Sequence, residues 1–283
     1  MFEGTYTAIV TPFNRNGRID FGALRAQIDI QARAGIDGIV PVGTTGESPT
    51  LDYDEHNQVI DAVVEACRGR MKVIAGTGAN STSEALDLTR HALEAGADGT
   101  LQVTPYYNKP NQEGLYRHFS AVADLGLPVV LYNIPGRTGR EIAVDTVLRL
   151  SKHPKIVAVK EAGGSVERVS AIASRGGITV LSGDDSLTLP MMAVGAKGVI
   201  SVVSNVAPRP VARMVRAALD GNYAEARKLH LKYYRLFLDL FIDTNPIPVK
   251  AALAMMGQIE EVYRLPLCPM SGALKQQLRK TLK

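Results

Sequence analysis

Eight short apolar runs alternate with longer helix-like stretches up to about residue 220, and no other feature of the chain restricts its fold as strongly. The runs cover residues 6–13, 36–43, 72–78, 100–107, 128–135, 156–162, 178–183 and 198–204. Runs that are apolar on both faces are typical of parallel strands covered by helices. The helical stretches between them begin at recognisable caps, among them Asp20, Asp52, Asn111 and Ser81, the last with Glu84 three residues later. Eight such units predict an α/β fold, a (β/α)8 TIM barrel, with an open doubly wound sheet as the alternative.

A short sequence pattern that recurs three times supports the count of repeated units. Three similar segments each end a helical pattern and precede a strand: Ala34-Gly-Ile-Asp-Gly38, Ala95-Gly-Ala-Asp-Gly99 and Val194-Gly-Ala-Lys-Gly198. The first glycine of each suits the left-handed turn that ends many helices. The recurrence favours repeated βα units over two unlike domains.

The pattern changes to helices alone after residue 222. Helical periodicity covers residues 223–242, 246–256 and 271–282. We therefore divide the chain into a barrel carrying the active site, residues 1–222, and a C-terminal all-helical extension, residues 223–283, with no flexible linker between them. The extension carries an apolar stripe, which predicts packing on the barrel or on a partner subunit: Leu229, Tyr233, Leu236, Phe237 and Leu240.

Charge and apolar content exclude several classes of protein. The net charge is +4, from 32 basic and 28 acidic residues without a long basic run, so neither nucleic acid nor an anionic membrane is indicated. No apolar run approaches about 18 residues, and the N-terminus lacks a secretory pattern, so we expect a soluble protein that is not exported. The chain has only two cysteines, Cys67 and Cys268, and they lie far apart in the sequence. Two such cysteines do not form a disulfide framework, which favours the reducing cytoplasm.

Signals for metals and cofactors are weak. The segment Gly76-Thr-Gly-Ala-Asn-Ser81 lacks the third glycine and the acidic ribose ligand of a dinucleotide site. We expect no metal and no organic cofactor, because the five histidines show no metal-ligand spacing: His56, His91, His118, His153 and His230.

Lys160 ends an apolar strand and precedes a turn with two glycines. The carboxyl ends of parallel strands form the active-site face of a barrel. Burial of a lysine favours its neutral amine, which attacks carbonyl groups. The alternatives are a lysine that extends to solvent or one that pairs with Glu161.

Other polar residues follow neighbouring strands. Thr44 and Thr45 lie between glycines, where hydroxyls and amides suit a carboxylate, although a capped turn would look the same. Tyr132 ends the strand before that of Lys160 and is placed to relay protons, or merely to satisfy a buried hydroxyl. Arg137 lies in a glycine-rich loop suited to binding a carboxylate, the alternative being a solvated arginine.

These residues belong to motifs that extend over nearly the whole chain. They are Gly43-Thr-Thr-Gly-Glu-Ser48, Gly76-Thr-Gly-Ala-Asn80, Val103-Thr-Pro-Tyr-Tyr-Asn108, Tyr132-Asn-Ile-Pro-Gly-Arg-Thr-Gly139, Val159-Lys-Glu161, Leu181-Ser-Gly-Asp184 and Asn245-Pro-Ile-Pro-Val-Lys250. Together they resemble the dihydrodipicolinate synthases (4-hydroxy-tetrahydrodipicolinate synthases) of the class I pyruvate-dependent aldolase and lyase family. The sugar-acid lyases of that family keep the lysine and the tyrosine, but their counterpart loop lacks Arg137.

The resemblance implies a lyase in diaminopimelate and lysine biosynthesis that condenses pyruvate with L-aspartate 4-semialdehyde. Lys160 is implied to form the Schiff base. The implied proton relay consists of Tyr132, Thr44 and, from a neighbouring subunit, Tyr107. The remaining implied contacts are Thr45 with the pyruvate carboxylate, Arg137 with the semialdehyde carboxylate, and Gly183 and Ile200 through their backbones. The expected assembly is a homotetramer built as a dimer of dimers.

The resemblance also implies a site for L-lysine as a feedback effector near the dimer interface. Its positions are Ser48, Pro49, Tyr53, His56, Asn80, Glu84 and Tyr106. Glu84 suits the ligand's ammonium, while Asn80 and Tyr106 suit its carboxylate. Alternatively, Glu84 is only the second member of a capping box that Ser81 begins. A different class of function, a non-catalytic sensor of a carboxylated metabolite, would not need Lys160 as a nucleophile.

Overall fold

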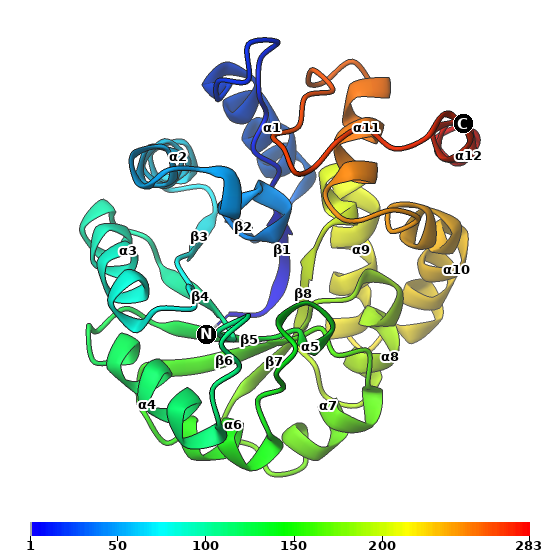
Figure 1. The fold of residues 1–283 in the computed structure, drawn as a ribbon. Coiled ribbons are helices and arrows are strands. Elements are labelled where there is room, and N and C mark those ends of the chain that lie inside the picture. Colours follow the sequence, from blue (N-terminus) through cyan, green and yellow to red (C-terminus); the bar gives the residue numbers. More distant parts are fainter. Residues whose placement is uncertain (1) are drawn as a thin grey trace.

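The computed structural model describes residues 2–283 and consists of a closed parallel barrel surrounded by helices (Figure 1). Neighbouring strands in the barrel follow chain order, and β1 pairs with β8 to close it. The strands are β1 (Gly4–Ala8), β2 (Gly38–Val40), β3 (Lys72–Gly76), β4 (Gly99–Val103), β5 (Val129–Asn133), β6 (Ile156–Glu161), β7 (Thr179–Ser182) and β8 (Gly198–Ser201). The predicted TIM barrel is confirmed.

Helices cover the outside of the barrel, except for the short α5, which lies at its mouth, and the last three follow the eighth unit (Figure 1). They are α1 (Phe21–Ala34), α2 (Tyr53–Cys67), α3 (Thr82–Ala95), α4 (Gln112–Ala123), α5 (Pro135–Thr138), α6 (Val144–Leu150), α7 (Val166–Ala173), α8 (Thr188–Ala193), α9 (Pro208–Leu219), α10 (Tyr223–Asp239), α11 (Ile247–Met255) and α12 (Gly272–Thr281). Within residues 2–283, none of these helices combines the length and apolar character needed to cross a lipid bilayer.

The predicted strands were too long at their carboxyl ends. The run 36–43 contains the three-residue strand β2, and the run 100–107 contains β4, which ends at Val103. The extra residues are apolar enough to resemble strand, but in the structure they form the loops at the barrel mouth. Tyr106 and Tyr107 of the predicted site lie in the loop after β4, whereas Lys160 and Tyr132 lie within β6 and β5 themselves.

The recurring turns have the predicted glycine geometry in two of three cases. Gly35 and Gly96 end α1 and α3 in the left-handed conformation, with φ of 79° and 90°. Gly195 has φ of 118° and follows the helix end at Val194. Only glycine adopts such backbone angles readily.

Three predicted helix caps are confirmed, and one is wrong. The side chains of Asp20, Asp52 and Asn111 each accept a hydrogen bond from the first turn of their helices. Ser81 precedes α3, but its side chain does not cap the helix, because its hydroxyl bonds instead to the hydroxyl of Ser83 at 2.9 Å. Glu84 is therefore not part of a capping box.

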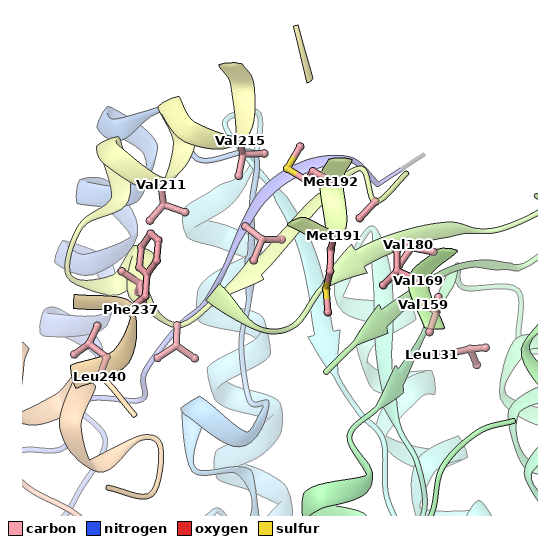
Figure 2. Close-up of a cluster of buried hydrophobic side chains, with 14 of the residues drawn as sticks. Leu131, Val159, Val169, Val180, Met191, Met192, Val211, Val215, Phe237 and Leu240 are labelled. Atoms are coloured by element: carbon pink, nitrogen blue, oxygen red, sulfur yellow. The ribbon is translucent and has the colours of Figure 1, made fainter. Parts of the chain in front are cut away.

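The main hydrophobic core lies between the strands and the outer helices and continues into α10. Figure 2 shows Leu131, Val159 and Val180 of the barrel in one cluster with helical side chains, including Phe237 of α10, and with Leu240 just after that helix. The predicted apolar stripe of the extension thus packs on the barrel. A second cluster fills the inside of the barrel: Phe2, Tyr6, Ala8, Val40, Ile74, Leu101, Val130, Tyr132, Ala158, Leu181 and Ile200.

Candidate active site

Lys160 and Tyr132 lie side by side at the carboxyl ends of β6 and β5. The parallel register pairs the two residues directly, and the ammonium nitrogen lies 4.0 Å from the centroid of the phenol ring. Both side chains are buried, with 6% and 5% of their surface exposed. A lysine held against an aromatic face at this depth is positioned rather than free in solvent.

Glu161, the next residue, does not pair with Lys160. Its carboxylate accepts hydrogen bonds from Arg168 at 2.8 Å and from the side-chain amide of Asn133 at 2.8 Å. Gly163 donates its backbone N–H to the same carboxylate at 2.9 Å. The predicted alternative of a Lys160–Glu161 pair is therefore wrong, because alternation along the strand places the two side chains on opposite faces.

Gly183 leaves the space that Lys160 occupies. A Cβ atom at this position would lie 2.8 Å from Cε of Lys160 and 2.7 Å from Cβ of Ala162. Its N–H donates to the carbonyl of Glu161 at 2.7 Å, which fixes β7 beside β6. Ile200 on β8 is fully buried in the inner cluster.

Thr44 and Thr45 lie in a single 3-10 turn, Thr44–Gly46, that follows β2. Thr44 lines the cavity described below, whereas Thr45 is 3% exposed and its hydroxyl accepts a hydrogen bond from the amide of Asn245 at 3.0 Å. Because the Thr45 hydroxyl acts as the acceptor in this bond, its O–H can still donate a hydrogen bond to another group. The two threonines therefore have different surroundings, a difference that the sequence did not predict.

A cavity of about 200 Å³ lies at the barrel mouth beside these residues. Thr44, Tyr132 and the exposed Arg137 of α5 all line it. The guanidinium of Arg137 donates a hydrogen bond to the carbonyl of Asn245 at 3.1 Å, so it is held at the rim. The cavity thus combines a hydroxyl, a phenol and a guanidinium, groups that suit a small carboxylate substrate.

Of the predicted catalytic residues, Thr44 and Tyr132 line this cavity, whereas Lys160 and Tyr107 do not. Tyr107 lies on the loop after β4. Its side chain is 91% exposed, and its backbone has φ of 70°. A non-glycine residue in this conformation is uncommon and marks a constrained loop. Tyr106 beside it is 38% exposed and does line the cavity.

The predicted effector positions form two groups: those that line the cavity and those that do not. Ser48 and Pro49 line the same cavity as Tyr106. His56 is buried with Nε2 3.0 Å from the carbonyl of Gly76, and burial lowers its pKa. The carbonyl of Asn80 accepts a hydrogen bond from Asn108 at 2.8 Å.

Glu84 lies close to both exposed tyrosines of the predicted effector set. The pKa of the Tyr53 phenol is raised by burial and then by the nearby Glu84 carboxylate. The pKa of Tyr106 is raised by burial and, to a smaller extent, by Glu84. One carboxylate thus faces two phenols, an arrangement that can receive a ligand ammonium.

Asp185, in the segment that follows β7, is buried, with 2% of its surface exposed. Its carboxylate accepts hydrogen bonds from the Ser201 hydroxyl and from the N–H groups of Val202 at 3.0 Å and Val203 at 3.2 Å. Burial raises its pKa to about 6. Its role is to shape the loop after β8.

The sequence analysis missed a group of residues that connects the extension to the threonine turn. Glu47, Asn245 and Lys250 are all buried and touch this turn or each other. All three lie within family motifs of the sequence, but no role was predicted for them. Lys250 is the one charged residue of the otherwise apolar helix α11, Ile247–Met255. In the part of the chain that the structure describes, no group of three His, Cys, Asp or Glu side chains is arranged to hold a metal ion.

The similarity to known proteins extends over the whole chain. The Dihydrodipicolinate synthetase family matches residues 1–283. A curated relative, the 4-hydroxy-tetrahydrodipicolinate synthase of Geobacter metallireducens, is 53% identical over 286 residues, which cover 100% of this chain and 98% of the relative.

Solved structures give the same result. The chloride-inhibited dihydrodipicolinate synthase from Acinetobacter baumannii complexed with pyruvate has a TM-score of 0.98 at 44% identity, with 100% and 98% of the two chains covered. The enzyme from Cyanidioschyzon merolae with lysine bound has a TM-score of 0.96 at 42% identity, with 99% and 97% covered. The family predicted from the motifs is confirmed, and the chain belongs to the dihydrodipicolinate synthetase family.

Proposed function

We propose that this chain is a 4-hydroxy-tetrahydrodipicolinate synthase, a lyase that condenses pyruvate with L-aspartate 4-semialdehyde on the path to diaminopimelate and lysine. The observation that carries the proposal is the buried Lys160 against Tyr132 at the mouth of a (β/α)8 barrel. The full-length similarity to enzymes of that name gives independent support.

The chemistry follows from an amine that attacks a ketone. The neutral amine of Lys160 adds to C2 of pyruvate, and loss of water gives an imine. A proton then leaves the pyruvate methyl group to give an enamine, whose carbon attacks the aldehyde of the semialdehyde and forms the new carbon–carbon bond. Displacement of Lys160 from the adduct, by water or by the substrate's amino group, frees the enzyme.

The surrounding groups bind the two carboxylates and move protons. Thr45 and its turn hold the pyruvate carboxylate, and Arg137 holds that of the semialdehyde at the rim. Tyr132 and Thr44 carry protons to and from the reacting oxygen, and the partner subunit's Tyr107 connects this relay to solvent. Gly183 and Ile200 contribute backbone groups beside the lysine.

Reduction with borohydride tests the central step. Protein treated with pyruvate and borohydride should gain the mass of one reduced adduct, and peptide mapping should place it on Lys160. An unmodified Lys160 would contradict the proposal. A sensor that merely binds a metabolite predicts instead that Lys160→Arg keeps pyruvate binding and that no turnover occurs in the parent.

A second assay tests the acceptor. Turnover is compared between aspartate semialdehyde and a sugar aldehyde, each with pyruvate. Arg137 at the rim favours the semialdehyde because its guanidinium pairs with a carboxylate. A preference for the sugar aldehyde would move the chain to another branch of the family.

We further propose a homotetramer built as a dimer of dimers. Tyr107 is almost fully exposed on a constrained loop, and Tyr53 beside Glu84 is 52% exposed. Such aromatic side chains are typical of protein interfaces. Sedimentation at several protein concentrations tests this assembly, and a monomer at all of them would contradict it.

L-Lysine is proposed as an effector at the same interface. Glu84 offers a carboxylate for the ligand's ammonium, and Tyr106 joins this region to the catalytic cavity. The relative from Cyanidioschyzon merolae has been solved with lysine bound.

Two further assignments concern the whole chain. We propose that residues 1–222 form the barrel unit carrying the active site and that residues 223–283 form the helical extension. We also propose a cytoplasmic location, in keeping with the free thiols of Cys67 and Cys268. Fractionation of the source cells tests the location.

A further inference from the structure

The loop that carries Thr44 and Thr45 is held in a constrained backbone conformation. It begins at Val42 with φ of 48° and ends at Glu47 with φ of 56°. A β-branched residue such as Val42 rarely adopts positive φ, because its side chain crowds the backbone there. Conformations of this kind persist only where the surroundings determine them.

The groups that hold this loop come from the segment that follows β1 and from the C-terminal extension. The Thr11 hydroxyl donates to the carbonyl of Gly46 at 2.7 Å. Lys250 of α11 forms an ion pair with the Glu47 carboxylate, and its ammonium also donates to the carbonyl of Thr11 at 3.2 Å. The N–H of Arg264 donates to the other oxygen of Glu47 at 3.3 Å.

The ion pair lies entirely within the protein. Lys250 and Glu47 are 0% exposed, and the ammonium lies 4.3 Å from the centroid of the Phe13 ring. Burial lowers the pKa of Lys250, while the nearby Glu47 carboxylate opposes this effect.

Such a pair is an unusual way to stabilise a fold. Desolvation of two charges offsets most of their attraction, so an apolar pair of similar volume is often as stable. An ion pair does, however, fix the position of its partners through directional hydrogen bonds. The pair occurs where a strained, polar turn has to be presented to a ligand.

We infer that Lys250 is a positioning residue of the active site: through Glu47 it fixes the turn Thr44–Gly46, so that the turn can bind the pyruvate carboxylate beside Lys160. This inference rests on the proposed function. Lys250 itself does not line the cavity. Its effect is transmitted over one residue, from Glu47 to the turn that precedes it.

The test uses the full-length protein with Lys250→Met, Glu47→Gln and the double variant. A matched control is Asp239→Asn, since Asp239 is also a buried carboxylate of the extension, 1% exposed and bonded to Arg235 at 2.8 Å, but it contacts α12 instead of the threonine turn. Thermal unfolding is recorded for each protein. The pyruvate KM, kcat and borohydride adduct on Lys160 are measured well below the unfolding midpoint.

Both single variants should raise the pyruvate KM by about ten- to a hundredfold, the effect of a binding group displaced by about 1 Å. The Lys160 adduct should still form at saturating pyruvate, and kcat should change less than KM. The single variants should unfold at lower temperature because one buried charge loses its partner. The double variant should regain thermal stability but keep the raised KM, which separates positioning from folding.

Two results would overturn the inference. If the parent forms the Lys160 adduct but the pyruvate KM of the folded variants moves no more than that of Asp239→Asn, the ion pair is only structural. If the double variant regains the parent KM together with its stability, the positioning role is also excluded. A parent that forms no adduct at all would overturn the proposed function, and this inference with it.

Discussion

The ammonium nitrogen of Lys160 lies 4.0 Å from the centroid of the Tyr132 ring because the register of β5 and β6 places the two residues opposite each other. The aromatic face attracts the cation and restricts the lysine chain to one side of the barrel. The two functions proposed for Tyr132, orienting Lys160 with its ring and relaying protons with its hydroxyl, can therefore be tested separately.

Tyr132→Phe keeps the ring and removes the hydroxyl. We expect kcat to fall by about 10²- to 10⁴-fold, the usual contribution of a positioned acid–base group. The reduced pyruvate adduct should still form on Lys160 at long incubation times, as judged by mass spectrometry. Full activity in Tyr132→Phe would show that the phenol carries no proton.

Gly183→Ala places a methyl group only 2.8 Å from Cε of Lys160. The lysine chain has to move, so we expect loss of the Schiff base and of turnover. The matched control is Gly272→Ala, whose added methyl group meets nothing within 4 Å. Equal activity in the two variants would mean that Lys160 has room to adapt.

Tyr107→Phe and Lys160→Ala should complement each other. Mixed oligomers contain some sites with an intact lysine and an intact tyrosine from the partner, so activity should return after subunit exchange. Exchange is verified with mass-labelled chains. If exchange occurs without recovery, Tyr107 acts within its own chain or does not act at all.

Glu84→Thr should weaken inhibition by L-lysine, because the variant loses the carboxylate that we propose pairs with the ligand's ammonium. Losing a charge-assisted hydrogen bond of about 1.5–3 kcal/mol corresponds to roughly ten- to a hundredfold in the inhibition constant. Calorimetry and turnover are compared with the parent. Unchanged inhibition would place the effector elsewhere, and a parent that binds no lysine would remove the regulatory proposal.

His118→Asn should make stability less sensitive to acid. Burial lowers the pKa of His118 to about 4, against about 6.5 in an unfolded chain. Between these values the unfolded state binds more protons, so the free energy of unfolding falls as the pH drops, by up to about 1.4 kcal/mol per pH unit. Asparagine keeps an acceptor near the Thr82 hydroxyl, which lies 2.9 Å from Nδ1. Urea unfolding at several pH values measures the slope, and an unchanged slope would contradict the prediction.

The sequence predicted the barrel because the period of apolar runs is a local property that burial on both faces imposes. It also predicted that Tyr132 and Lys160 end neighbouring strands, which the register of β5 and β6 confirms, since the carboxyl ends of parallel strands meet on one face. The strand limits were less accurate. Val103 ends β4, yet the residues after it continue the apolar pattern into the loop.

Contacts between distant segments were not predictable in this way. Lys250 and Glu47 are 203 residues apart in the chain, and nothing in either local pattern identifies the other as a partner. The same holds for the bond between Asn245 and Thr45, which spans 200 residues. Ser81 failed as a cap for a different reason, since a serine before a helix has a second partner available in Ser83.

Closure of the barrel between β1 and β8 has a consequence for synthesis of the protein. The side-chain amide of Asn205, just beyond β8, donates to the carbonyl of Ala8 across 197 residues of sequence. Until the ribosome has released that later segment, the first strand has a neighbour on one side only. At roughly 5–20 residues per second this interval lasts on the order of ten seconds or more. The open edge of β1, buried in the finished enzyme, is exposed for that time to pairing with other nascent chains.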